Sequence, residues 1–174
     1  MDDSDFTNDP RLKYLRPGIV ESWKNQDDWR LKNRSSELSA RYKMIFQKQL
    51  ELVLAMHRAR VKMLAASDAV VWYVVPGFSL HDELELFVKA GLTPMEALQT
   101  ATLNPATYLG LSDVVGTVEE GKKADLVLLE ANPLETISNT KRISAVIVNG
   151  KQIPRGSLDK MLRDAEAAAK REMK

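Results

Sequence analysis

The sequence predicts an α/β fold in which helices come first along the chain and a small group of strands follows. From Leu38 to His57, apolar residues recur at steps of three and four, the period of an amphipathic helix. Residues 125–129 and 143–148 are short runs of strand-forming residues. Asn149-Gly150 is a typical two-residue hairpin turn before a third strand at 151–153. Helices and strands are therefore expected in separate parts of the chain.

The polar segment before the first long helix, from Met1 to about Ser36, is expected to be a loop with one or two short helical turns, anchored by Trp23 and Trp29. After that helix, the run from Val61 to Ser67 has the length and composition of a buried strand that ends at Asp68. A lone strand between helices leaves its backbone groups without partners. We therefore expect it to pair with another chain or with sequence that is missing here.

A second helix is predicted to begin at Ser79. Its hydroxyl is expected to cap free backbone amides, and Asp82 to complement the helix dipole. Gly91 can end this helix, because glycine readily adopts the left-handed conformation of a C-terminal cap.

A third helix has a stronger start signal in Thr93-Pro94-Met95-Glu96, which combines a capping hydroxyl, a proline in the first turn and a glutamate. It is expected to end near Asn104-Pro105, before a short turn that runs to Gly110. From Ser157 onward, apolar residues at helical spacing predict a terminal amphipathic helix.

Composition and charge exclude several classes of partner. The chain has 25 basic and 24 acidic residues and a formal charge of +1, so no net field favours nucleic acid or an anionic membrane. No apolar run is long enough to span a bilayer, and the acidic opening is unlike a signal peptide. The chain has no cysteine, which removes thiolate metal sites and agrees with the cytoplasmic location expected here.

Several phrases of the sequence, taken together, resemble one known family. They are Met63–Ala69, Val75–Leu86, Ala90–Leu98, Ala101–Ala106, Gly116–Val127 and Val148–Lys151. As a set they resemble the last barrel strand, the following helices and the returning β-domain of amidohydrolases of the imidazolonepropionase-like and prolidase-like branch. Asp9 to Leu15 resembles a loop before the penultimate barrel helix, so the resemblance covers about residues 9–155.

The resemblance implies that this chain is a C-terminal fragment of a (β/α)8 metal-dependent hydrolase barrel, with the active site at the C-terminal strand ends. In that family one or two divalent metals are held by a His-x-His pair, often a carboxylated lysine, two later histidines and a final aspartate. Zinc is the metal we expect. Asp68 matches the final aspartate. It is expected to bind metal and to shuttle a proton while metal-activated water attacks an amide-like carbon.

The other ligands of that set are absent from this chain. Its only histidines are His57 and His81, and no His-x-His occurs. A single carboxylate offers too few donors for a tight metal site. The chain alone is therefore expected to hold no metal tightly.

Each candidate residue also has a purely structural explanation. A lone acid after a strand, such as Asp68, is often a cap or turn residue, and the neighbouring matches favour the ligand role for a parent enzyme. His57 lies on the apolar helix stripe and is expected to be a packed, hydrogen-bonded histidine. His81 either faces a pocket as a substrate-binding residue or is an exposed residue of the first helical turn, and both alternatives stay open.

The expected organisation is a partial barrel over residues 1–112, part of a small β-sandwich domain over 113–156 and a C-terminal helix over 157–174. One functional hypothesis is a parent hydrolase that cleaves C–N bonds of a small amide, cyclic amide or dipeptide-like molecule, with this chain inactive by itself. The alternative is a catalytically silent module, derived from such an enzyme, that oligomerises or binds a partner. The expected macromolecular partner is a second copy of the chain or the missing N-terminal part of the barrel.

Overall fold

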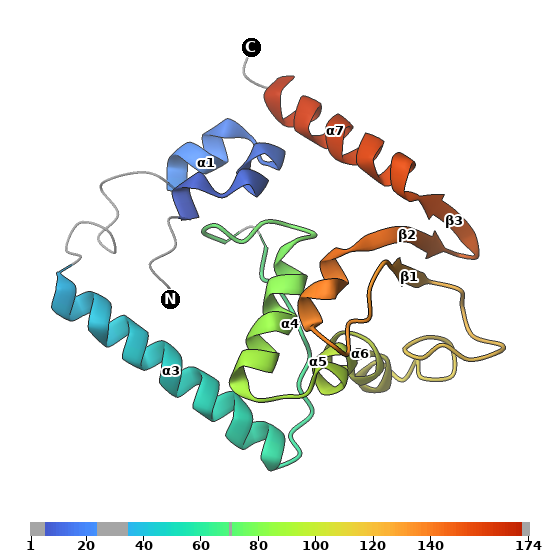
Figure 1. Cartoon of the computed structure of the whole chain (residues 1–174), viewed down its shortest axis with the longest axis horizontal. Helices are drawn as coiled ribbons and strands as arrows, with labels where there is room; N and C mark the ends of the chain where they lie inside the picture. The colour runs from blue at the N-terminus through green and yellow to red at the C-terminus, as the bar shows by residue number, and fades with distance from the viewer. Residues whose placement is uncertain (1–5, 24–34, 70, 172–174) are drawn as a thin grey trace.

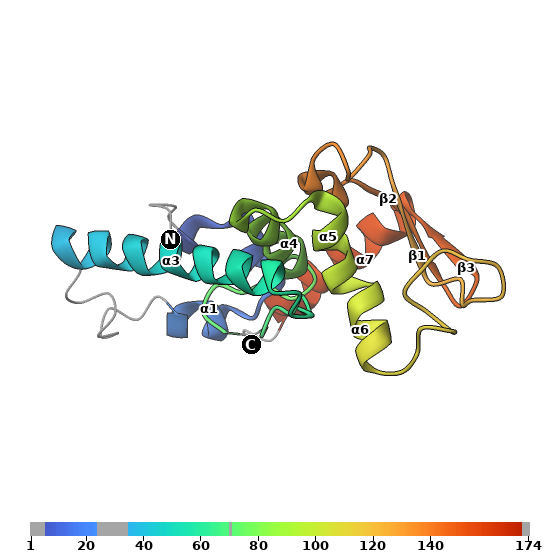
Figure 2. The same cartoon turned by 90° about the horizontal axis from the view of Figure 1, so that it is seen from below.

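The computed structural model describes residues 6–23, 35–69 and 71–171, which form helices around a small core and a three-stranded sheet at one end (Figures 1 and 2). Trp29, one of the two expected anchors, lies outside the described residues. The elements in chain order are η1 (Phe6–Asn8), η2 (Pro10–Tyr14), α1 (Pro17–Trp23), α3 (Ser36–Arg58), α4 (Ser79–Ala90), α5 (Pro94–Ala101), α6 (Leu103–Tyr108), β1 (Leu126–Leu129), η3 (Ile137–Lys141), β2 (Ile143–Val148), β3 (Lys151–Pro154) and α7 (Arg155–Arg171).

The sheet is antiparallel in the order β1-β2-β3, which confirms the three predicted strands. Leu126 pairs with Ile147, and Val148 pairs with Lys151 across the hairpin. Asn149 and Gly150 have φ of 49° and 76°. Positive φ at both central residues is the geometry of a type I′ turn, whose twist matches that of the two strands.

The helical core forms where α3, α4 and α5 meet. Its buried residues are Leu84, Phe87, Leu92, Ala97 and Ile137. The apolar stripe predicted on α3 contributes Val53 to this cluster, and Leu50 on the same stripe is also buried. Gly91 ends α4 with φ of 114°, as predicted from the sequence.

The start of α5 carries the predicted capping box. The Glu96 N–H donates to Thr93 Oγ1 over 3.3 Å, and the Thr93 N–H donates to Glu96 Oε2 over 2.8 Å. The predicted end near Asn104-Pro105 is wrong, because α5 ends at Ala101 and these two residues lie in the first turn of α6. Proline is tolerated there, since the first amides of a helix have no partner within the helix.

The predicted cap at Ser79 is also wrong. Phe78 occupies the N-cap position of α4 and makes no side-chain cap hydrogen bond. Ser79 is already helical, and its hydroxyl donates to the Val75 carbonyl over 2.9 Å. Bonding to the carbonyl four residues earlier is the usual alternative for a helical serine.

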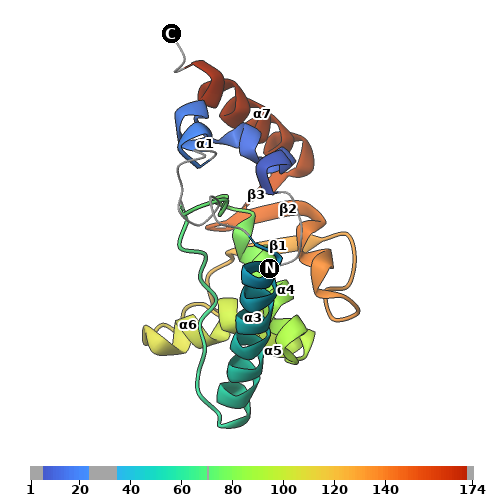
Figure 3. The ribbon, with the colours of Figure 1, turned by 90° about the vertical axis from the view of Figure 1, so that its left-hand side faces the viewer.

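The segment from Val61 to Ser67 is neither helix nor strand, so the prediction of a buried strand here is wrong. After α3 the chain turns and runs back toward the start of α4 without regular secondary structure (Figure 3). Exposure still alternates along it as in a half-buried strand: Met63 and Ala65 pack on the helical core, whereas Leu64 and Ala66 are exposed. A strand assignment requires a neighbouring strand with ladder hydrogen bonds, and no described strand pairs with this segment.

The N-terminal part forms a second small cluster, as expected for a loop with short helical turns. Leu12, Trp23 and Val75 are its buried residues. Tyr73 Oη donates to the Trp23 carbonyl over 3.1 Å, and the two ring centroids lie 5.4 Å apart. The predicted anchoring role of Trp23 is therefore confirmed.

The terminal helix α7 confirms the predicted amphipathic helix from Ser157. It contacts η2 as well as β2 and β3, so it connects the N-terminal segment with the sheet. Among the described helices, none combines the length and apolar character that a membrane crossing requires.

Candidate functional site

Asp68 lies where the extended segment ends and the loop toward α4 begins. Asp68 is exposed, and its backbone φ is 46°. The Asp68 carbonyl accepts the Val71 N–H over 3.2 Å. Left-handed backbone is tolerated by aspartate better than by most side chains, so the chain can turn sharply directly after the segment.

Asp68 is exposed, as are Leu64 and Ala66 of the preceding segment, and it directly follows that segment in the chain. Within residues 6–23, 35–69 and 71–171, no three His, Cys, Asp or Glu side chains gather as a metal site would require. The described donors do not by themselves fit a tight metal centre, and the ligand role of Asp68 stays a prediction.

His57 is a packed, hydrogen-bonded residue, as predicted. Its Nε2 lies 3.0 Å from Glu96 Oε1, which joins the end of α3 to the first turn of α5. An open hollow of about 260 Å³ borders this pair at the end of the extended segment opposite to Asp68. Its lining residues are His57, Arg60, Val61, Lys62, Met63, Leu92, Glu96, Gln99, Thr100 and Asn104.

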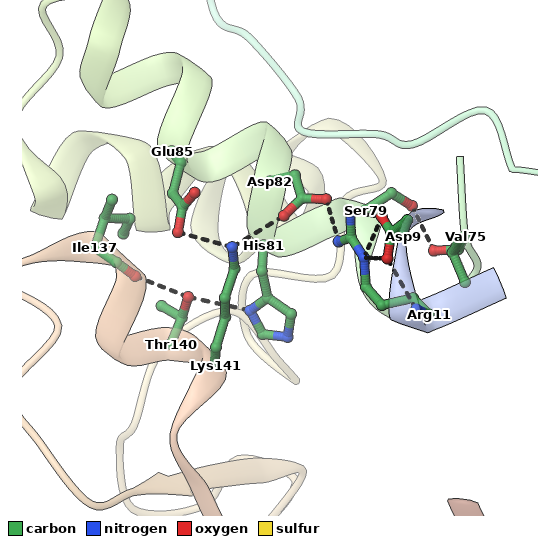
Figure 4. Close-up of polar contacts among 10 residues, drawn as sticks. All are labelled: Asp9, Arg11, Val75, Ser79, His81, Asp82, Glu85, Ile137, Thr140 and Lys141. Carbon is green, nitrogen blue, oxygen red and sulfur yellow. Dashed lines mark hydrogen bonds and ion pairs between the residues drawn. The ribbon is translucent and has the colours of Figure 1, made fainter. Parts of the chain in front are cut away.

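His81 faces η3 and is half-buried (Figure 4). Its Nδ1 lies 3.1 Å from Thr140 Oγ1, and this buried hydroxyl also contacts the Ile137 carbonyl over 2.8 Å. Since a carbonyl can only accept, the hydroxyl proton goes to Ile137, and His81 Nδ1 is the donor to Thr140. Burial and the nearby Lys141 charge lower the pKa of His81. The substrate-binding role of His81 stays a prediction.

A chain of alternating charges lies beside His81, and sequence reasoning did not find it (Figure 4). Arg11 contacts Asp9 Oδ2 over 2.6 Å and donates through Nη1 to Asp82. Lys141 lies 3.0 Å from Asp82 and 2.9 Å from Glu85. These contacts join η2, α4 and η3. The Asp9–Arg11 pair is local in sequence, whereas no sequence signal connects either residue with α4.

The pKa values of the acids reflect these contacts. Burial raises the pKa of Asp82, but hydrogen bonds from Arg11 and Lys141 outweigh it, and the value lies below the usual one. For Asp9, the hydrogen bond from the Arg11 side chain is the largest influence and lowers the pKa. Both carboxylates are therefore held in their ionised form.

A comparison with known families covers most of the chain. A model of the amidohydrolase family matches residues 25–153. The chain belongs to the amidohydrolase family. Within that family it fits the branch that includes imidazolonepropionases and prolidase-like proteins.

Curated relatives share a limited part of their length with this chain. The 5′-deoxyadenosine deaminase of Methanobrevibacter smithii is 36% identical over 70 residues, which are 40% of this chain and 16% of that protein. The imidazolonepropionase of Thermoplasma volcanium is 40% identical over 70 residues, with the same two shares. The matches thus span about a sixth of each relative.

Solved structures cover more of the chain. A putative prolidase from Bifidobacterium longum is 33% identical with a TM-score of 0.53, over 65% of this chain and 29% of that one. A bottromycin amidohydrolase has a TM-score of 0.77 over 95% of this chain and 36% of that one, at 21% identity. The second likeness shows that nearly the whole chain shares its fold with one part of a larger amidohydrolase.

Proposed function

We propose that this chain supplies the C-terminal part of a metal-dependent hydrolase that cleaves C–N bonds of a small amide-like, cyclic amide or dipeptide-like substrate. In this proposal Asp68 contributes one metal ligand and carries a proton during hydrolysis. The other ligands come from outside the described residues. A divalent metal, with zinc the first candidate, would supply an activated water when bound.

The observation that carries the proposal is the position of Asp68. It is exposed, and it directly follows a segment with strand-like alternation of exposure. In barrels of this general type, catalytic groups lie at the C-terminal strand ends. The names of the relatives, a deaminase and an imidazolonepropionase among them, support chemistry at C–N bonds.

His81 has a different place in the proposal. Its Nδ1 is occupied by Thr140, so Nε2 is the ring nitrogen left to accept a hydrogen bond from a substrate. The lowered pKa keeps the ring neutral near pH 7, which preserves this acceptor.

The alternative function is that of a catalytically silent module that oligomerises or binds a partner. It is favoured by the open face of the extended segment, where Leu64 is 39% exposed. The two functions differ in metal content, since only catalysis requires a metal with several ligands.

The proposal is tested with chain 1–174 and with a longer polypeptide that carries the rest of an amidohydrolase domain. With zinc or manganese added, we expect the isolated chain to show no amidase or dipeptidase turnover above background. Asp68→Asn should leave its unfolding free energy and metal content nearly unchanged. In the longer polypeptide the same substitution should lower turnover by several orders of magnitude, because it removes a metal ligand and a proton carrier together.

Asp113→Asn is the matched control, because Asp113 is also exposed but lies outside the extended segment. It should leave turnover of the longer polypeptide unchanged. Metal-dependent turnover by the isolated chain, abolished by Asp68→Asn, would contradict the proposal.

A further inference from the structure

Two consecutive backbone turns follow Asp68 in the loop toward α4. The Asp68 carbonyl accepts the Val71 N–H over 3.2 Å, and the Val71 carbonyl accepts the Val74 N–H over 2.7 Å. Each bond joins residues three positions apart, as in a β-turn. Tyr73 lies in the second turn, directly before Val74. A contact that fixes Tyr73 therefore also restrains the turn that begins at Asp68.

Tyr73 has an unfavourable backbone conformation. Its φ is 61°, and Asp68 at the start of the first turn has φ of 46°. The left-handed region is tolerated by aspartate much better than by a bulky aromatic residue. A residue persists in such a conformation only where the surrounding structure stabilises it. The contacts of the Tyr73 side chain must therefore offset the cost of its backbone.

The N-terminal segment, residues 6–23, makes these contacts. Tyr73 Oη donates to the Trp23 carbonyl over 3.1 Å. The Tyr73 ring centroid lies 5.4 Å from that of Trp23 and 6.2 Å from that of Phe6, both within the range of attractive aromatic pairs. Two residues further along, Val75 is 2% exposed and belongs to the same cluster as Trp23. The loop accordingly runs beside the N-terminal helices in Figure 1.

We propose that Tyr73 is a positioning residue for Asp68. Its hydroxyl and ring attach the second turn to the N-terminal segment, and the second turn fixes the first through the two carbonyl bonds. The first turn sets where the Asp68 carboxylate lies. In this role Tyr73 touches no substrate. The inference rests on the proposed function of Asp68, whereas the coupling between Tyr73 and the turns can be measured without any activity.

Hydrogen exchange of chain 1–174 tests the coupling. Tyr73→Phe keeps the ring and removes the bond to the Trp23 carbonyl. We expect the amides of Val71 and Val74, which close the two turns, to exchange about five- to tenfold faster, as the loss of one hydrogen bond implies. Tyr73→Ala should accelerate both amides further, because the ring contacts are lost as well.

Ser144→Ala is the matched control for a lost hydrogen bond. Ser144 Oγ also donates to a backbone carbonyl over 3.1 Å, that of Leu128 in the sheet. The amides of a loop exchange through local opening, so only a bond that this opening breaks changes their rate. Ser144→Ala should therefore leave the exchange of Val71 and Val74 unchanged, even if it lowers the free energy of unfolding.

The longer polypeptide that carries the rest of an amidohydrolase domain tests the consequence for Asp68. Tyr73→Phe should lower kcat about tenfold or more and leave KM nearly unchanged, because a displaced catalytic group weakens binding of the transition state alone. Ser144→Ala should change neither constant. A residue with a merely structural role would not produce this separation of kcat from KM.

Unchanged exchange of Val71 and Val74 in Tyr73→Phe would overturn the inference, and so would a rise in KM at constant kcat. If Asp68→Asn abolishes turnover but Tyr73→Phe leaves kcat unchanged, the positioning role alone fails. If Asp68→Asn retains turnover, the proposed function fails, and the role of Tyr73 fails with it. The two failures are thereby distinguishable.

Discussion

Arg11 and Asp82 are 71 positions apart in the chain, and Arg11 Nη1 donates to Asp82 Oδ2. The same guanidinium binds Asp9, so one side chain holds the turn at η2 against the first turn of α4. Arginine suits this place because its planar group can bond to two carboxylates at once. The N-terminal segment is thereby fixed to the helix that follows the Asp68 loop.

Removing this connection should lower stability measurably. We expect Arg11→Ala to reduce the free energy of unfolding by about 1 kcal/mol, since charge-assisted hydrogen bonds are lost but the site is partly exposed. Arg11→Lys should recover only part of the loss, because an ammonium cannot bridge both acids in the same geometry. Urea unfolding measures the effect. Lys160→Ala breaks a more exposed ion pair and should change stability by less than about 0.5 kcal/mol.

The same network predicts how stability depends on pH. The folded pKa values of Asp9 and Asp82 lie below the ordinary value of 3.8. Their contribution is complete above pH 3.8 and is lost as the pH falls through the lower folded values, because the unfolded chain binds protons first. Urea unfolding at several pH values should show that the free energy of unfolding falls in acid, and that it falls less steeply with pH in Asp82→Asn. An identical slope in this variant would exclude Asp82 as a source of the decline.

Gly116 is predicted to tolerate no side chain. Its φ is 101°, and a Cβ there would lie 2.6 Å from Ala106 Cβ, which belongs to a buried residue of α6. Gly116→Ala should cost about 2–3 kcal/mol of unfolding free energy, since the strained backbone and the clash add. Gly110 has φ of 69° with nothing within 4 Å of such a Cβ, so Gly110→Ala should cost only about 1 kcal/mol. If Gly116→Ala and Gly110→Ala lower the free energy of unfolding equally in thermal or urea unfolding, the contact with Ala106 adds nothing to the cost.

The local sequence was sufficient to predict several elements of the fold. The period of α3, the capping box of Thr93 and Glu96, and the Asn149-Gly150 turn all act within a few residues of the chain. A helix satisfies its backbone groups internally, and a two-residue turn sets the register of its own strands. These elements could therefore be predicted before any tertiary contact was known.

Tertiary structure alone decided the rest. Whether Val61 to Ser67 is a strand depends on a neighbour to receive its backbone hydrogen bonds, and the described part of the chain pairs only one edge, through Thr100 and Asn104. The bond from Arg11 to Asp82 likewise joins segments that are distant in sequence. Asp68 became a candidate through the resemblance of the surrounding residues to the amidohydrolase family. The turn that exposes Asp68 was not predicted, because the left-handed backbone and the bond from the Val71 N–H appear only in the folded chain.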